Sequence, residues 1–127
     1  MSGRTDLVAL VGRMLLAAIF LVSGWAKLMN PAGTIQYFTT LGLPIPPLTY
    51  FVTVAVELFG GIAFLIGFRA RWAALVLAVF CILTAVMVHY HPNDRGQMIN
   101  FWKNIAMTGG FLQVMAWGPG RWSVDRR

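Results

Sequence analysis

The sequence predicts an all-α membrane protein: one domain over residues 1–127, folded as a four-transmembrane-helix bundle with a short interfacial helix between spans 1 and 2. Three observations predict this fold class. A chain of 127 residues is one domain at most. Only 11% of its residues are charged, whereas a soluble domain carries about 25%, so the charges are too few to cover a water-exposed surface. The third observation is a set of long apolar runs.

These apolar runs are the predicted spans, at residues 7–28, 48–68, 72–90 and 99–118. Each is close to the roughly 20 residues that a helix needs to cross a bilayer. A membrane-barrel strand needs only about 10 residues and alternates in polarity, so the runs do not fit strands. The first run is long and leads into no polar mature domain, so we do not expect a cleaved signal peptide.

The sequences between the apolar runs agree with the predicted ends of the spans. Asn30 followed by Pro31 is typical of a helix start, and apolar residues recur on one side of 31–41, which predicts a short helix in the membrane interface. The sequence "LPIPP" (43–47) forces a turn before the second span. The connection 67–71 is so short that the second and third spans must be antiparallel neighbours.

The basic residues predict the orientation. They lie at the edges of the apolar runs and form no patch in sequence, so we expect the lipid bilayer as a partner and no nucleic acid. With four spans, both termini lie on the same side of the membrane. Seven basic residues lie on that side and three on the opposite side. The first group is Arg4, Arg13, Arg69, Arg71, Arg121, Arg126 and Arg127, and the second is Lys27, Arg95 and Lys103. The positive-inside rule then places both termini in the cytoplasm.

Glu57 is a carboxylate in the middle of the second apolar run. At about 1.5 Å per residue from the cytoplasmic ends, Glu57 lies about 18 Å deep, Lys103 about 23 Å, Arg13 about 9 Å and Lys27 about 30 Å. A charge facing hydrocarbon costs several kcal/mol, so we expect Glu57 to face the bundle interior and to bond Arg13 or Lys103, or a water that they hold. A structural role and a role in a ligand or proton site both remain open.

Paired glycines in two of the runs, Gly60–Gly61 and Gly109–Gly110, predict close helix packing. Other chemistry is not expected. His89 and His91 are two apart and share no helix face, so no metal site is predicted, and the chain has no cofactor motif of its own. The lone Cys81 excludes an internal disulfide.

Three segments carry a family resemblance: "RMLLAAIFLVSGWAKL" (13–28), "ELFGGIAFLIGFRARWAAL" (57–75) and "HPNDRGQMINFWKNIAMTGG" (91–110). Their order of Arg, Ser-Gly-x-x-Lys, Glu-x-x-Gly-Gly, Lys-Asn and Gly-Gly resembles the DoxX family of small bacterial integral membrane proteins. The resemblance implies a four-helix bundle in the bacterial inner membrane. Its recurring polar positions carry over as the ligand or proton site Glu57, Lys103, Arg13, Asn104 and Lys27.

Three functions fit this resemblance. The first is a redox-associated membrane subunit that binds a quinone or a similar small amphiphile and has membrane redox or stress-response proteins as partners. The second is a membrane adaptor or assembly protein whose polar cluster is purely structural. The third is a small-solute transporter, which would need a homo-oligomer because four short spans hardly form a complete pathway. The resemblance favours the first and assigns no catalytic residue.

Overall fold

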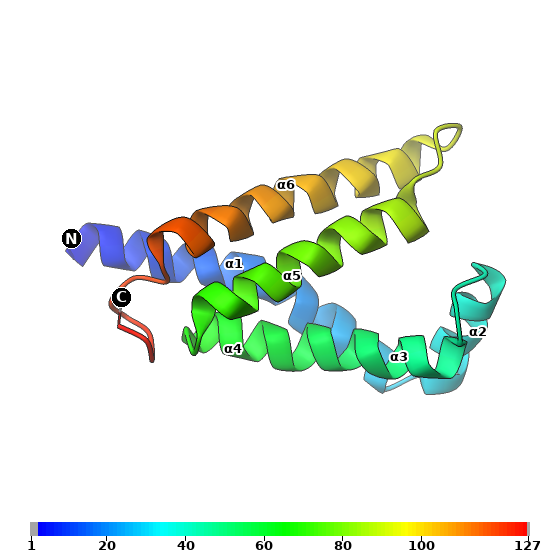
Figure 1. Cartoon of the computed structure of the whole chain (residues 1–127), viewed down its shortest axis with the longest axis horizontal. Coiled ribbons are helices and arrows are strands. Elements are labelled where there is room, and N and C mark those ends of the chain that lie inside the picture. Colours follow the sequence, from blue (N-terminus) through cyan, green and yellow to red (C-terminus); the bar gives the residue numbers. More distant parts are fainter. Residues whose placement is uncertain (1–2, 127) are drawn as a thin grey trace.

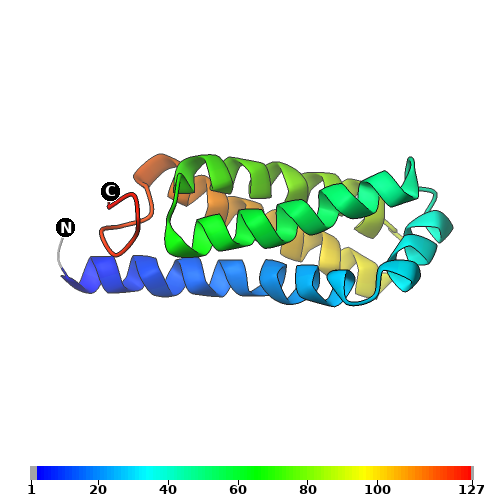
Figure 2. The same ribbon diagram turned by 90° about the horizontal axis from the view of Figure 1, so that it is seen from below.

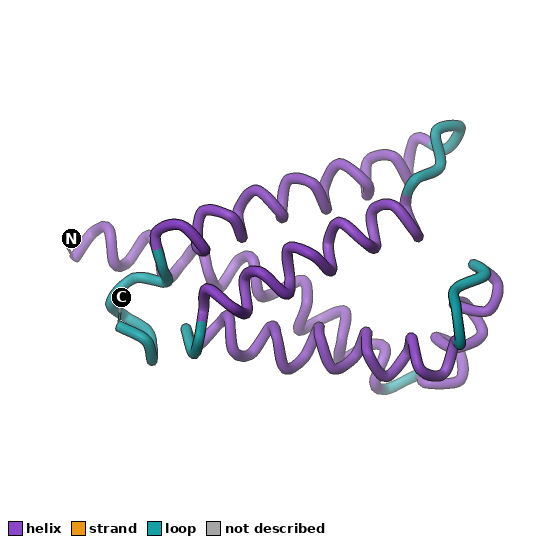
Figure 3. Tube along the Cα trace, in the orientation of Figure 1, coloured by secondary structure: helices purple, strands orange, loops and turns teal. Residues whose placement is uncertain are grey.

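The computed structural model describes residues 3–126, and these residues form helices joined by short connections, with no strand among them (Figure 3). The elements, in chain order, are α1 (Gly3–Leu28), α2 (Pro31–Thr40), α3 (Pro46–Ala55), the π-helical turn η1 (Val56–Gly60), α4 (Gly61–Ile66), α5 (Ala70–Thr84), the π-helical turn η2 (Ala85–His89) and α6 (Arg95–Trp117). The segments α3–η1–α4 and α5–η2 are each continuous, so four long helical stretches and the short α2 make up the molecule (Figure 1).

All five predicted helices are present. Their ends lie within two residues of the expected ones, except that α1 and α6 each begin four residues early, at Gly3 and Arg95. Three stretches are long and apolar enough to cross a membrane: Gly3–Leu28, Pro46–Ile66 and Ala70–His89. Many of their large apolar side chains are exposed, as on a lipid-facing surface. The helix α6 has 23 residues but is less apolar, so its crossing stays a prediction.

The short helix α2 begins as its sequence predicts. The Asn30 side chain caps it by accepting a hydrogen bond from the Gly33 backbone N–H at 3.2 Å, and Pro31 occupies the first turn. Its buried residue Phe38 packs with Tyr50 and Val54 of α3. The predicted helix is therefore confirmed and lies against α3, while its position at a membrane interface stays a prediction.

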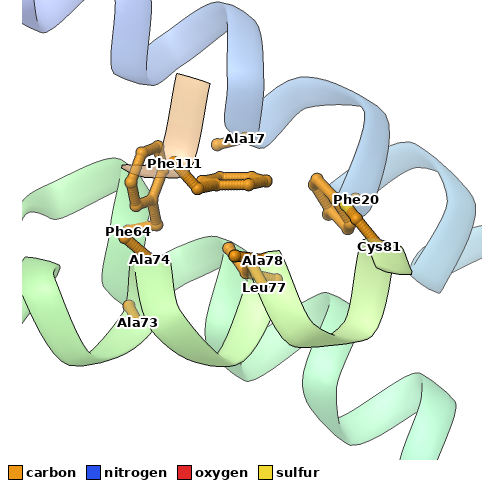
Figure 4. Packing of buried hydrophobic residues seen from close by; sticks show 9 residues of the cluster. All are labelled: Ala17, Phe20, Phe64, Ala73, Ala74, Leu77, Ala78, Cys81 and Phe111. Atoms are coloured by element: carbon orange, nitrogen blue, oxygen red, sulfur yellow. The ribbon is translucent and has the colours of Figure 1, made fainter. Parts of the chain in front are cut away.

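The main core lies in the half of the bundle that holds both ends of the described chain. Phe111 of α6 is fully buried, and its ring lies 5.0 Å from that of Phe64 and 5.6 Å from that of Phe20, between centroids (Figure 4). Small residues of α5 such as Ala74 and Ala78 complete this cluster. The α5–α6 pair is close to the other helices here and diverges from α3 toward the opposite end (Figure 1). Seen at right angles, α1 runs alongside α3–η1–α4 (Figure 2).

Glycines allow the helices to approach at three of the four positions predicted. A Cβ atom at Gly60, Gly61 or Gly110 would lie 3.0–3.3 Å from a leucine side chain of a neighbouring helix. Gly109 has nothing within 4 Å, so the prediction was wrong there, because Gly109 is on the exposed side of α6. The closest approach of α1 is at Gly24, where a Cβ would lie 2.9 Å from Leu58 and 3.0 Å from the Glu57 Cβ.

The segment after α6 folds back over the end of the bundle. Asp125 accepts hydrogen bonds from the backbone N–H groups of Arg69, at 2.9 Å, and Ala70, at 2.7 Å. It therefore caps the start of α5, which has no capping side chain of its own. Asp6 of α1 accepts from the Arg121 N–H at 3.2 Å. Two acidic side chains thus join this segment to α1 and α5.

The substitution Gly24→Ala should destabilise the bundle by about 1–3 kcal/mol, because the added methyl group overpacks the contact with Leu58 and Glu57. The matched control is Gly109→Ala, which meets nothing and should raise stability by about 0.5–1 kcal/mol through its better helix propensity. Thermal unfolding of both variants in one detergent checks the prediction. Equal effects of the two substitutions would contradict it.

Candidate functional site

A cavity of about 790 Å³ occupies the half of the bundle where the helix pairs diverge. Its walls come from α1, α2, α3 and η1 on one side and from α5, η2 and α6 on the other. Most of the wall is apolar, with Phe20 and Phe80 next to the main core. A strip of polar side chains interrupts this apolar surface: Ser23, Lys27, Thr53, Glu57, Thr84 and Asn104.

An ion pair between Lys27 and Glu57 lies on the cavity wall. The Lys27 Nζ is 2.8 Å from the Glu57 Oε1 and also donates a hydrogen bond to the Ser23 Oγ at 2.6 Å. The Glu57 side chain is 4% exposed and that of Lys27 is 23% exposed. Within residues 3–126, Oε1 receives no well-aligned hydrogen bond, so the contact with Lys27 is an ionic one. The carboxylate is therefore held mainly by charge.

The predicted interior position of Glu57 is confirmed, but its predicted partners, Arg13 and Lys103, were wrong. The error comes from the register of α1. The sequence suggests Leu7 as the start of the span, whereas the structure aligns Arg13 with the end of α4. That change of six residues moves α1 by about 9 Å. Gly24 then lies beside Glu57, where an added Cβ would be 3.0 Å from the Glu57 Cβ, and Lys27 follows about one helical turn later, with its ammonium 2.8 Å from the carboxylate.

Arg13 lies outside the cavity and holds the end of the bundle together. Its guanidinium is 1% exposed and donates to the backbone carbonyl oxygens of Leu65 and Trp122. It therefore joins α1 to the end of α4 and to the C-terminal segment. Such bonds satisfy carbonyl groups that a helix end leaves unpaired. Of the predicted site residues, Arg13 is the one with a clearly structural position.

Lys103 and Asn104 are neighbours in α6 with opposite positions. Lys103 is exposed and does not line the cavity. Asn104 lines it and donates from Nδ2 to the Thr84 Oγ1 at 2.7 Å and to the Cys81 carbonyl oxygen at 3.2 Å. Successive helical residues differ by about 100° around the axis. Lys103 therefore lies on a different face of α6 from Asn104, and the residues that share the cavity wall are Lys27, Glu57 and Asn104.

Sequence reasoning missed three hydroxyl groups of the polar strip, those of Ser23, Thr53 and Thr84. Ser23 precedes Lys27 by four residues, a helical spacing that places both side chains on one face and could have been recognised. Thr84 is joined to Asn104 across 20 positions in sequence, and nothing local indicates that pairing. The two π-helical turns also border the cavity, which matches the frequent occurrence of such turns at functional sites.

The geometry offers polar contacts inside an otherwise apolar space. An ammonium group, a carboxylate and an amide face one cavity, so a ligand could find both hydrogen-bond donors and a proton-accepting group there. The part of the chain from 3 to 126 contains no cluster of three residues suited to a metal ion. The arrangement is typical of a small-molecule site, which combines apolar walls with a few polar groups.

Comparison with known proteins gives a consistent set of relatives. The family model described as DoxX matches residues 8–90. Inner membrane protein YphA of Escherichia coli (strain K12) is 37% identical over 93% of this chain and 88% of its own length. Inner membrane protein YqjF of the same organism is 38% identical over 95% and 92%. "Putative oxidoreductase CatD" of Bacillus subtilis (strain 168) is 31% identical over 69% and 64%. No solved structure matches the chain significantly.

The substitution Lys27→Met should destabilise the protein by about 2–3 kcal/mol, because it leaves the buried Glu57 carboxylate without its counter-ion. Lys103→Met is the control, since Lys103 is exposed, and it should change stability by less than about 0.5 kcal/mol. Adding Glu57→Gln to Lys27→Met should recover much of the loss. Thermal unfolding of the four proteins measures these differences. A larger loss for Lys103→Met than for Lys27→Met would restore the rejected pairing.

Proposed function

The chain belongs to the DoxX family, and we propose that it is a multi-pass inner-membrane protein of four spans whose cavity binds a quinone or a similar small amphiphile in a redox-associated membrane complex. The observation that carries this proposal is the cavity itself, with Lys27, Glu57 and Asn104 on an apolar wall.

The size of the cavity suits a ring-sized ligand. Ligand pockets are typically about 300–1,000 Å³, and this cavity measures about 790 Å³. Its apolar wall favours a ligand that is itself mostly apolar, because burial of apolar surface drives binding. A solute rich in hydroxyl groups would leave many of them unpaired there, at a cost for each group. The walls therefore favour an amphiphile over a sugar or an amino acid.

The polar strip suits carbonyl groups. A quinone presents two carbonyl oxygens on opposite sides of a flat ring, and both only accept hydrogen bonds. The Lys27 ammonium of α1 has a third N–H beyond its contacts with Glu57 and Ser23, and it can donate this proton to one carbonyl oxygen. Asn104 of α6 can donate to the second carbonyl oxygen by exchanging one of the bonds that its Nδ2 makes to Thr84 and Cys81. Glu57 beside Lys27 adds a group that could take up or release a proton. These three residues are the proposed contacts of the ligand.

The redox association rests on similarity and on the nature of the ligand. The name of CatD describes an oxidoreductase, and the match to it covers 69% of this chain. We propose that a partner protein exchanges electrons with the bound quinone, while this chain holds the ring. The adaptor function is the second candidate, favoured by the way the Lys27–Glu57 pair and Arg13 join separate helices.

Purified protein in lipid nanodiscs should bind a short-chain benzoquinone, and Glu57→Gln should weaken that binding by about tenfold or more. The substitution keeps the size of the side chain, so the fold and the cavity should persist while the charge that orients Lys27 is lost. Titration calorimetry measures the affinity, and a melting curve checks the fold. Lys103→Gln is the control and should bind like the unchanged protein.

Two outcomes would reject this function. No binding of the benzoquinone to the unchanged, folded protein would reject the ligand class. Equal binding by the unchanged protein and Glu57→Gln would reject the role of the carboxylate and favour a purely structural pair, as the adaptor function requires. A protein that copurifies in constant proportion, with no bound ligand in the lipid extract, would support the adaptor as well.

The proposed topology predicts that reporter fusions at both termini are active in the cytoplasm and that one inserted at Asn93 is active outside. The reason is the excess of basic residues at the end that holds Arg69 and Arg121, whose backbone N–H groups bond to Asp125 and Asp6 near the two ends of the described chain. Paired cytoplasmic and periplasmic reporters at each site provide the measurement. A C-terminus on the outer side would mean that α6 does not cross, or that the whole bundle is inverted.

A further inference from the structure

We infer that the cavity opens sideways into the bilayer, through a window between α3 and α5–η2, and that its ligand is an amphiphile whose long apolar tail leaves through this window. The inference rests on the proposed function for the identity of the head group. It adds the route of entry and the requirement for a tail. The lateral window is defined by four residues: Leu48 and Val52 of α3, Leu83 of α5 and Met87 of η2.

Each window residue lies both on the cavity wall and on the outer surface of the bundle. All four line the cavity, and yet they are exposed, Leu48 by 55%, Val52 by 52%, Leu83 by 51% and Met87 by 48%. A side chain that lines an enclosed cavity is normally buried. Side chains with both properties therefore mark the place where the cavity meets the outside of the bundle. Since all four are large and apolar, the outside at this place is suited to acyl chains rather than to water.

The spacing of these residues places them on facing stripes. Leu48 and Val52 are four residues apart, and so are Leu83 and Met87, so each pair forms one stripe along its helix. The other face of α3 is occupied by Tyr50 and Val54, which pack against α2. On the other side of α5, Asn104 of α6 bonds to Thr84. The two stripes thus border the gap that widens between α3 and α5 (Figure 1).

The far end of the cavity has a different character. Gly33, Thr34 and Tyr37 of α2 line it, so this short helix covers part of that end. The turn before α3 adds Ile45, which lines the cavity and is 65% exposed. On the opposite wall the His89 Nδ1 lies 2.8 Å from the Gln97 Oε1, a polar pair beside the loop before α6. An apolar tail would lose free energy by leaving through these polar groups, at about 0.8 kcal/mol for each CH₂ exposed to water. The lateral window is the route that keeps a tail in an apolar environment.

The volume of the cavity leads to the same ligand. A space of about 790 Å³ holds one drug-sized ligand, so a quinone ring fits there with only the first part of a chain long enough to reach across a leaflet, and the rest of that chain lies outside. A tailed ligand must keep most of its chain outside the bundle while its ring lies near Lys27 and Glu57. The lateral window connects these two environments. The ligand class is therefore a carbonyl-bearing ring with an isoprenoid or alkyl tail.

The test compares two ligands and two kinds of variant. The ligands are a benzoquinone with a tail of about three isoprenoid units and the same ring without a tail, both titrated into protein in nanodiscs. Val52→Trp and Met87→Trp fill the window. Phe51→Trp and Val86→Trp are the matched controls, because these exposed residues are neighbours of the window residues in sequence but do not line the cavity. Melting curves establish that all four variants fold.

The window variants should weaken binding of the tailed quinone by about tenfold and change binding of the tailless ring by less than about twofold. Both control variants should bind both ligands as the unchanged protein does. Unchanged binding of the tailed quinone by the folded window variants would overturn the inference. Ile19→Trp and Ile45→Trp test two other edges of the cavity, on α1 and in the turn before α3, where exposed apolar residues also lie on the wall. A selective loss in one of these two variants alone would place the opening there instead.

A second measurement separates this inference from the proposed function. If neither quinone binds the unchanged protein, the quinone is wrong, and an alkyl diazirine dissolved in the nanodisc lipid replaces it as a probe of the opening. Photolysis should then label cavity residues such as Thr53 or Cys81, which are buried from the outside, and the window variants should reduce that labelling severalfold. Labelling restricted to exposed residues in the unchanged protein would overturn the lateral opening whatever the head group is.

Discussion

The register of α1 against α3–η1–α4 determines where every polar group of this protein lies. Two contacts fix it. The buried Arg13 guanidinium bonds to the Leu65 and Trp122 carbonyl oxygens at one end, and Gly24 lets α1 approach Glu57 and Leu58 further along. Between them, α1 cannot slide without unpairing a buried cation or creating a clash. Because both contacts hold, Lys27 reaches Glu57, and the pair forms on the wall of the cavity rather than in lipid.

The same arrangement explains why one half of the bundle is filled and the other is hollow. Around Phe111, large aromatic rings from three helices meet small residues of α5, which gives dense packing. Beyond this cluster the α5–α6 pair diverges from α3, and the gap is bordered by polar side chains and by both π-helical turns. Asn104 and Thr84 keep α5 and α6 together there. The hollow half is thus supported by hydrogen bonds and charge, and the filled half by apolar contacts.

Much of the fold could be predicted from the sequence, because apolar runs and helix-capping residues are local signals. The helices, the cap at Asn30 and the interior position of Glu57 followed from them. The partner of Glu57 did not. The apolar residues before Arg13 made the span seem to begin too early, and height alone gave no direction for Lys103. The cap that Asp125 provides to α5 joins residues 55 positions apart, and no local pattern indicates such a contact. The register of one helix against another and the rotation of a helix about its axis depend on packing between distant segments. A local sequence pattern does not contain that information.

The partial exposure of the ion pair bears on what it can do. A fully buried and fully hydrogen-bonded pair would resist any change of partner, because each step would leave a charge unpaired in a low dielectric. Here Lys27 is 23% exposed at the cavity, and the Glu57 Oε1 is held by the ammonium without an aligned hydrogen bond. A carbonyl oxygen entering the cavity could share the Lys27 ammonium while the carboxylate stays in place, so no bare charge would form. Ser23, one helical turn before Lys27, already shares that ammonium in this way. The geometry that stabilises the bundle is therefore compatible with ligand binding at the same residues. Glu57 can stabilise the fold and take part in ligand binding at the same time, because neither role requires the ion pair to break.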